Sequence, residues 1–197
     1  MRYIRWPFIL FFRGCAMLSV FSSIPVALRR FLLLAIAFYA LWFFGYERGL
    51  ALDGRLDALL SANITAASSA TLRALGFDTS VHGLDPYLLL LNSQPAVHVG
   101  HPCNGLVLYA LFAGFVLAFP GPWARKLWFI PVGMLVIYLI NIVRIAALAL
   151  NHLYSAETVE FNHHYTFTFI VYGFIFLLWM LWARRLAGPA AQQALRA

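Results

Sequence analysis

Residues 127–150, LWFIPVGMLVIYLINIVRIAALAL, decide the fold, because they form a long apolar run with one charge, Arg144. A helix needs roughly 17–25 predominantly apolar residues to cross the hydrocarbon core of a bilayer. Three further stretches fit this requirement, the first with an added turn at either end: residues 31–46, 104–120 and 165–183. The sequence therefore predicts an all-α integral membrane protein with about four transmembrane helices.

The composition also indicates a lipid environment. Hydrophobic residues make up 63% of the chain and charged residues 11%, against about 45–50% and about 25% in soluble domains. The net charge is +7, but no basic stripe interleaved with polar groups follows the pattern of a phosphate backbone. We expect a single membrane domain over residues 29–185 and no nucleic-acid partner.

The basic residues orient this domain, because positive residues beside membrane helices remain cytoplasmic. With four crossings, three basic pairs fall on one side: Arg29–Arg30, Arg125–Lys126 and Arg184–Arg185. All seven acidic residues fall on the other side. The predicted topology has both termini in the cytoplasm, a cytoplasmic tail over residues 186–197 and an outer loop over residues 47–102.

The outer loop carries two kinds of pattern. Leucines recur at helical spacing between residues 50 and 75, which predicts one or two short amphipathic helices resting on the membrane surface. Two apolar runs, Tyr87–Leu91 and Ala96–Val99, flank a turn sequence and predict a β-hairpin. That hairpin leads directly to Cys103.

Residues 1–28 form a basic N-terminal segment in which Arg13 interrupts an apolar run. An interfacial amphipathic helix fits this pattern. A cleaved signal peptide does not fit, because its apolar region carries no central charge. A fifth crossing is the alternative, and it would invert the orientation.

Cys103 stands in the string His101-Pro102-Cys103-Asn104-Gly105, at the predicted start of the second membrane helix. The other cysteine, Cys15, falls on the opposite side of the membrane, so Cys103 is expected to be a free thiol. Backbone N–H groups and the positive end of the helix dipole favour a thiolate there. The alternative is an inert cysteine that suits a helix start by its small size.

Arg144 is the charge inside the third membrane helix. Such a charge costs about 2.5–3.5 kcal/mol on insertion scales and by default marks a functional site. It lies about 17 residues into the predicted helix, roughly 25 Å from the cytoplasmic end and near the outer boundary. Asn141 shares its helix face and is expected to hold the guanidinium by a hydrogen bond. The alternative is snorkelling to the outer headgroups.

His163 and His164 lie where the fourth helix enters from the outer side. Counting crossings brings Cys103, Arg144 and the histidine pair to one level on one face. A thiolate, an imidazole and a guanidinium form a set for acyl transfer, as nucleophile, proton carrier and oxyanion stabiliser. Adjacent helical residues point about 100° apart, so only one histidine faces the thiolate. We favour His164, which lies deeper in the helix.

Two alternatives to the enzyme remain. One is a metal site built from His98, His101 and Cys103 beside the histidine pair, since zinc accepts such ligands; the spacing fits no closed structural zinc motif, and Arg144 would have no role beside a cation. The other is a non-enzymatic transporter or assembly subunit that uses Arg144 to bind an anionic lipid or polysaccharide. Only the enzyme needs the thiol of Cys103.

Three motifs in this order resemble the exosortase and archaeosortase family of membrane transpeptidases. They are a Cys-x-Gly motif at the head of a helix, an Asn-x-x-Arg-Ile stretch in the next long helix, and a histidine after an acidic, Phe-containing loop. Here they are Cys103-Asn104-Gly105, Asn141-Ile142-Val143-Arg144-Ile145 and Glu160-Phe161-Asn162-His163-His164. The resemblance covers about residues 86–185. Asn104 stands where the family commonly has Ser, and the histidine doublet leaves the catalytic one open.

The resemblance implies a Cys, Arg, His catalytic set, with Asn104 and Asn141 as substrate-binding or supporting residues, and no cofactor or metal. It implies that a C-terminal sorting helix is cut from exported proteins at the outer face of the bacterial cytoplasmic membrane. The acyl-enzyme would pass to water or to an acceptor, such as a cell-surface polysaccharide or lipid. The expected partners are therefore exported proteins with a C-terminal transmembrane sorting signal, together with membrane lipid.

Overall fold

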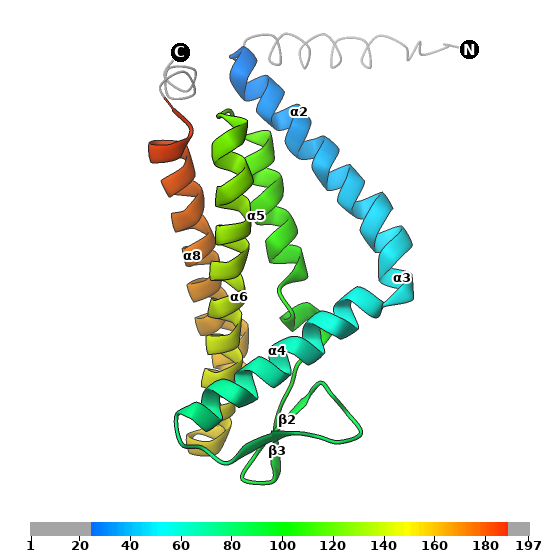
Figure 1. Ribbon diagram of the computed structural model, residues 1–197, viewed down its shortest axis with the longest axis vertical. Coiled ribbons are helices and arrows are strands. Elements are labelled where there is room, and N and C mark those ends of the chain that lie inside the picture. Colours follow the sequence, from blue (N-terminus) through cyan, green and yellow to red (C-terminus); the bar gives the residue numbers. More distant parts are fainter. Residues whose placement is uncertain (1–24, 189–197) are drawn as a thin grey trace, which may run out of the picture.

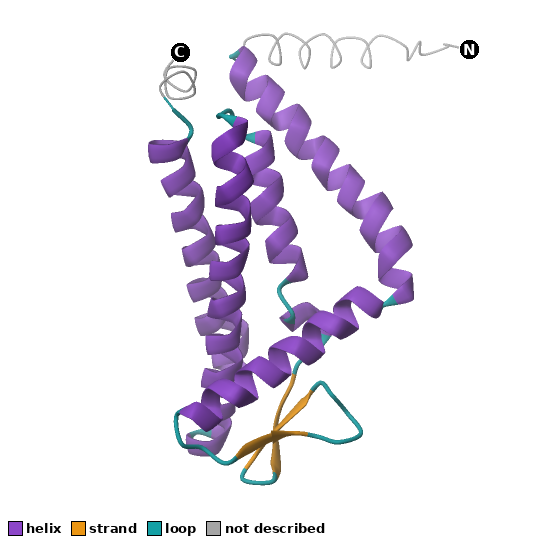
Figure 2. Cartoon of the chain, viewed as in Figure 1, coloured by secondary structure: helices purple, strands orange, loops and turns teal. Residues whose placement is uncertain are grey.

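Figure 1 shows a computed structural model of the protein, which describes residues 25–188. The expectations for the N-terminal segment up to residue 24, including Cys15, and for most of the C-terminal tail lie outside this range. The described chain is mostly helical, with one small sheet at one end of the helical bundle (Figure 2).

An apolar helix is present at each of the four predicted positions. The first is α2 (Val26–Leu41), which continues as the π-helical segment η1 (Trp42–Leu50). The second is α5 (Leu106–Ala118), the third is α6 (Trp123–Tyr154), and the fourth is α8 (Phe167–Leu181) followed by η5 (Trp182–Leu186). The first, third and fourth are long and apolar enough to span a bilayer alone, whereas α5 is shorter.

Three of the helices extend further than the uncharged intervals of the sequence. Arg29, Arg125 and Arg184 all lie within helical segments. An uncharged interval marks the part of a helix that lies in hydrocarbon, but the helix itself continues through the interfacial charges, because its hydrogen bonds are internal. The predicted boundaries were therefore too narrow for these three.

Helices α5, α6 and α8 run side by side, and α2 meets α5 near one end and diverges from it toward the other (Figure 1). Phe115 of α5 stacks on Trp179 of α8, with ring centroids 4.6 Å apart. Its edge contacts Phe31 of α2 at 5.6 Å. Aromatic packing of this kind holds helices together in lipid, where water supplies no hydrophobic driving force between them.

The outer loop forms α3 (Ala51–Asp53), α4 (Arg55–Ala74) and a three-stranded antiparallel sheet. The predicted hairpin is confirmed as β2 (Leu88–Leu91) and β3 (Gln94–His98), joined through Asn92 and Ser93 at φ of 51° and 61°. Two successive residues with positive φ are typical of a tight hairpin turn. The strand β1 (Thr79–Val81), which pairs with β2, was not predicted, because three residues carry too little alternation to be recognised.

Helix α4 is a single helix of 20 residues in place of one or two short ones. Its buried face is built largely from small polar residues rather than from leucines: Asp57, Ser61, Ile64, Thr65, Ser68, Ser69 and Leu72. Leu59 and Leu75 are instead 71% and 66% exposed. Small side chains let α4 approach α6 closely, and Ser68 Oγ donates to the carbonyl oxygen of Ile142 at 3.4 Å.

The length of α6 explains where the outer elements pack. Its 32 residues span about 48 Å, whereas the hydrocarbon core is about 30 Å thick. The part of α6 beyond that thickness belongs to an apolar cluster. The cluster includes Ile145 and Leu148 of α6, Ile64 and Leu72 of α4, and Leu89 of β2. The end of α6 is therefore covered by α4 and the sheet.

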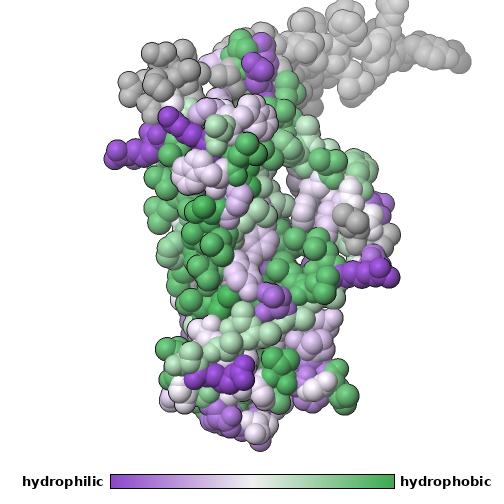
Figure 3. Space-filling view, in the orientation of Figure 1, coloured by the Kyte–Doolittle hydropathy of each residue, from purple (hydrophilic) through white to green (hydrophobic). Residues whose placement is uncertain are grey.

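The two ends of the molecule differ in charge. The helix ends that carry the three basic pairs lie together, and α4 and the sheet lie at the opposite end (Figure 1). In Figure 3 apolar side chains cover much of the bundle, and hydrophilic ones gather toward its ends. Among the described residues, one basic side chain is buried: Lys126 Nζ donates to the carbonyl oxygens of Leu117 and Phe119, each at 2.8 Å. It therefore satisfies carbonyl groups at the C-terminal end of α5.

Candidate active site

Cys103 closes the 3₁₀ turn η2 (His101–Cys103), which directly follows β3 and Gly100. Helix α5 begins at Leu106, two residues later than the predicted start at residue 104, so the thiol lies in the turn before the helix rather than directly at its N-terminus. Asn104 accounts for this difference, because its side-chain Oδ1 accepts the N–H of Leu106 at 3.0 Å. Gly105, at φ +81°, supplies the left-handed residue between the turn and the helix.

Two asparagines hold the backbone around Cys103. Asn141 Nδ2 on α6 donates to the carbonyl oxygen of Cys103 at 2.9 Å. Asn104 Nδ2 donates to Asp57 Oδ1 on α4 at 2.7 Å. Each asparagine is only 1% exposed, and each amide donates to a neighbouring part of the protein. A Cβ at Gly105 would lie 3.3 Å from Asn141 Nδ2, which gives a second reason for glycine there.

Asn141 was expected to hold the guanidinium of Arg144, but its amide donates to Cys103 instead. Within residues 25–188, neither Asn141 Oδ1 nor Arg144 Nε has a hydrogen-bond partner. A shared helix face brings two side chains near each other without deciding which neighbouring element each contacts. Here the loop before α5 lies within hydrogen-bonding distance of the Asn141 amide.

His163 lies in the π-helical segment η4 (Asn162–Thr166), between α7 (Val159–Phe161) and α8. Its Nε2 lies 3.2 Å from Cys103 Sγ. Asn162 ties this corner to α6 by a hydrogen bond of 2.9 Å from its Nδ2 to Asn151 Oδ1. Single π-helical turns inside helices are frequent at functional sites, because the extra residue reorients the side chains around it.

Arg144 approaches the same imidazole from α6, with Nη2 3.4 Å from His163 Nε2. It lies about 32 Å from Trp123 along the helix, beyond the thickness of the hydrocarbon core. Arginine has only donors, so this contact is a hydrogen bond only when His163 Nε2 carries no proton. In that state Nε2 is also able to accept the proton of the Cys103 thiol.

The structure thus brings together Cys103, Arg144 and His163 from three separate elements. The side chain of His164, which the sequence favoured, lies outside the described side chains. The sequence estimate used depth along a straight α-helix, whereas this corner is a π-helical turn in which residue directions differ. His163 is therefore the histidine that the described side chains place against the thiol, and the assignment of His164 stays a prediction.

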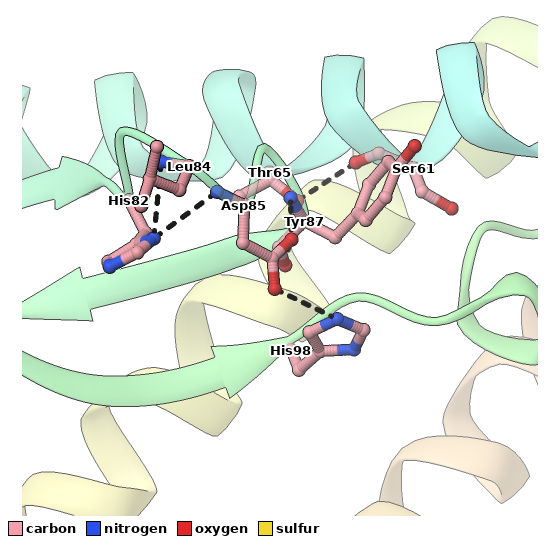
Figure 4. Close-up of polar contacts among 7 residues, drawn as sticks. All are labelled: Ser61, Thr65, His82, Leu84, Asp85, Tyr87 and His98. Carbon is pink, nitrogen blue, oxygen red and sulfur yellow. Dashed lines mark hydrogen bonds and ion pairs between the residues drawn. The ribbon is translucent and has the colours of Figure 1, made fainter.

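The described residues hold no group of three or more histidine, cysteine or acidic side chains placed to bind a metal ion. His98 instead lies 3.4 Å from the carboxylate of Asp85, and His82 Nδ1 accepts the N–H of Asp85 at 3.2 Å (Figure 4). His101 is exposed at the surface. His82 and His98 therefore make their contacts within the sheet and its loop.

The same outer region is tied to α4. Thr65 Oγ1 contacts both the carbonyl oxygen of Ser61, at 2.9 Å, and that of Tyr87, at 3.4 Å (Figure 4). Tyr87 N in turn donates to Asp85 Oδ1 at 3.0 Å. Because β3 leads into Cys103, anchoring the sheet to α4 also fixes the start of the loop that carries the thiol.

Two residues near the site were not predicted. Asp57 is buried on α4 and contacts Asn104, and Tyr46 at the end of the first membrane helix donates its hydroxyl to Asp57 Oδ2. A signal for Asp57 exists in the sequence, since it shares a helical face with Ser61, Thr65 and Ser68. No sequence pattern connects Tyr46 with that face.

The fold and these contacts define a class: a multi-helix membrane protein with a cysteine, histidine and arginine cluster at the end opposite its basic helix ends. The profile of the transmembrane exosortase family (Exosortase_EpsH) matches residues 4–183. The chain therefore belongs to the transmembrane exosortase family. The match confirms the resemblance seen over residues 86–185 and extends it through the first membrane helix. No curated protein and no solved structure matches the chain.

Proposed function

We propose that this protein is a cysteine protease or transpeptidase that cleaves exported proteins at the outer face of the bacterial cytoplasmic membrane. The observation that carries the proposal is the shared contact at His163 Nε2, with Cys103 Sγ at 3.2 Å and Arg144 Nη2 at 3.4 Å. Activated nucleophiles generally have this arrangement: the nucleophile lies within reach of a base, and a third group orients the base.

The first step transfers the proton of the Cys103 thiol to His163 Nε2. The thiolate sulfur then attacks the carbonyl carbon of the scissile peptide bond, which forms a C–S bond and places a negative charge on the carbonyl oxygen. Arg144 stabilises that oxyanion. Once Nε2 is protonated it no longer accepts from Arg144, so the proton transfer releases the guanidinium as the charge on the substrate develops.

The second step breaks the C–N bond of the tetrahedral intermediate. The leaving amine takes the proton from His163, and the acyl group remains on Cys103 as a thioester. Water or the nucleophile of an acceptor then attacks the thioester carbon, His163 removes its proton, and the Cys103 thiolate leaves and is reprotonated. An acceptor on a cell-surface lipid or polysaccharide gives transfer, and water gives hydrolysis.

The substrates proposed are exported proteins that end in a transmembrane sorting helix. The site lies at the end of the bundle opposite the three basic pairs, which are assigned to the cytoplasm. A peptide bond just outside a substrate's own membrane helix lies at this level. Membrane insertion of both proteins restricts the search for the bond to two dimensions.

The test coexpresses the protein with an exported reporter that ends in an apolar helix and a basic tail, and follows the size of the reporter on gels. Cys103→Ala is expected to abolish cleavage, and Cys103→Ser to be nearly as inactive, because a hydroxyl is much harder to deprotonate than a thiol. Cys15→Ala is the matched control and should cleave normally. Cleavage at a normal rate by Cys103→Ala would overturn the proposal and favour a binding role.

A further inference from the structure

We infer that Asp57 is a positioning residue for the nucleophile: its carboxylate, through Asn104, holds the loop that presents Cys103 to His163. The inference rests on the proposed function. It concerns a residue on the outer helix α4 that touches none of the three reacting side chains and that lies outside the motifs recognised in the sequence.

Asp57 stands out first by its burial. It is 5% exposed and is the only buried carboxylate among the residues that the structure describes. No lysine, arginine or histidine of that part of the chain forms an ion pair with it. Burying a carboxyl group is costly unless its oxygens are hydrogen-bonded, so the partners of Asp57 decide whether it is tolerated there.

Both carboxylate oxygens of Asp57 have partners, and the partners come from different elements. Oδ1 accepts from Asn104 Nδ2 at 2.7 Å, and Oδ2 accepts from the hydroxyl of Tyr46 at the end of the first membrane helix. The backbone oxygen of Asp57 also contacts Asn104 Nδ2, at 3.5 Å. Asp57 therefore joins α4 and the first membrane helix to the residue next to the nucleophile.

Asn104 transmits this anchorage to the thiol. One end of its amide is held by Asp57, and the other accepts the first N–H of α5 from Leu106 at 3.0 Å. On the opposite side of the same peptide, Asn141 holds the carbonyl of Cys103 at 2.9 Å. The peptide that follows Cys103 is thus clamped between α4 and α6, and the Sγ to Nε2 distance depends on both clamps. A misplacement of about 1 Å in a reacting group is costly to a reaction rate.

The experiment measures the second-order rate constant for alkylation of Cys103 by iodoacetamide in membranes from a Cys15→Ala background, as a function of pH. A rate constant reports on each folded molecule, so it does not change when a variant merely accumulates less. Asp57→Leu should lower the rate constant at neutral pH by about tenfold or more, since an unassisted thiol is ionised there to only about a few per cent. Asn104→Ala breaks the same bond from the other side and should give the same result if Asp57→Leu fails to accumulate.

Two controls sharpen the outcome. Asp57→Asn can still accept from Asn104 through its Oδ1 and can donate from its Nδ2 to the hydroxyl oxygen of Tyr46, so it should keep the original rate constant and pH profile. Asp53→Leu removes an exposed carboxylate close by on α3 and should also be unchanged. Unaltered or raised rate constants in both Asp57→Leu and Asn104→Ala would overturn the inference. His163→Ala, measured in parallel, tests the proposed function: an unchanged rate constant there would show that His163 does not activate the thiol, whereas a lowered one together with unaltered Asp57→Leu and Asn104→Ala would overturn only the inference about Asp57.

Discussion

At the scale of single residues, the contact between Cys103 and His163 supports His163 as the proton carrier. His163 Nε2 lies 3.2 Å from the thiol, and general acid–base catalysis by a positioned side chain contributes about 10²–10⁴-fold to a rate. His163→Ala should therefore slow reporter cleavage by about that factor, whereas His164→Ala should leave it within a few-fold. Initial rates of cleavage in membranes check this, and a larger loss in His164→Ala would restore the assignment favoured by the sequence.

Arg144 offers a second test at this scale. Lysine keeps the charge of arginine but not its planar fork of donors, so it cannot contact His163 and an oxyanion in the same geometry. Arg144→Lys should lower the cleavage rate by about 10²–10³-fold, the loss typical of removing one oxyanion donor. The variant should still accumulate in the membrane. If Arg144→Lys still cleaves at the original rate, a point charge suffices at this position, and the main role of Arg144 is snorkelling to the headgroups.

At the scale of the elements, the contact between α5 and α6 depends on a glycine. A Cβ at Gly133 of α6 would lie 2.1 Å from the ring of Phe112, which is fully buried in α5. Gly133→Ala should therefore force the ring out of its position and destabilise the bundle by about 1–3 kcal/mol, as overpacking does.

Gly173 of α8 is the matched control, because a Cβ there meets nothing within 4 Å. Gly173→Ala should leave the protein as stable as the original. Thermal unfolding of the detergent-solubilised protein, followed by loss of soluble protein on heating, compares the two. Equal midpoints for both variants would show that α5 and α6 are not packed through Gly133.

At the scale of the whole molecule, the distribution of charge predicts how the protein lies in the membrane. The helix ends that carry the basic pairs lie together, and α4 and the sheet lie at the other end (Figure 1). A reporter fused after Arg185 or between Gly121 and Lys126 should report the cytoplasm, and one near Asp78 should be exported. Reporters active only outside, such as alkaline phosphatase, distinguish the two sides. An exported reporter at Arg125 would contradict the four-helix topology and place the site in the cytoplasm.

The sequence by itself determined the features that depend on local composition. Apolar length identified the positions of the four apolar helices, three of which are long enough to cross a membrane, because crossing hydrocarbon demands a continuous apolar run whatever the helix packs against. Alternation around a turn identified the β2–β3 hairpin for a similarly local reason. Counting crossings predicted that Cys103, Arg144 and the histidine pair lie at one level, and the structure brings Cys103, Arg144 and His163 into contact.

Only the tertiary structure decided how those residues meet. Depth along a helix is known from its sequence, but rotation about the helix axis depends on packing and on departures such as the π-helical turn at His163. For that reason the structure, and not the sequence, showed that Asn141 turns to Cys103 rather than to Arg144, and that Lys126 is buried. The link from Tyr46 through Asp57 to Asn104 joins three elements distant in sequence. Hydrogen bonds of that kind cannot be recognised from the local sequence, because the partners meet only when separate elements pack against each other.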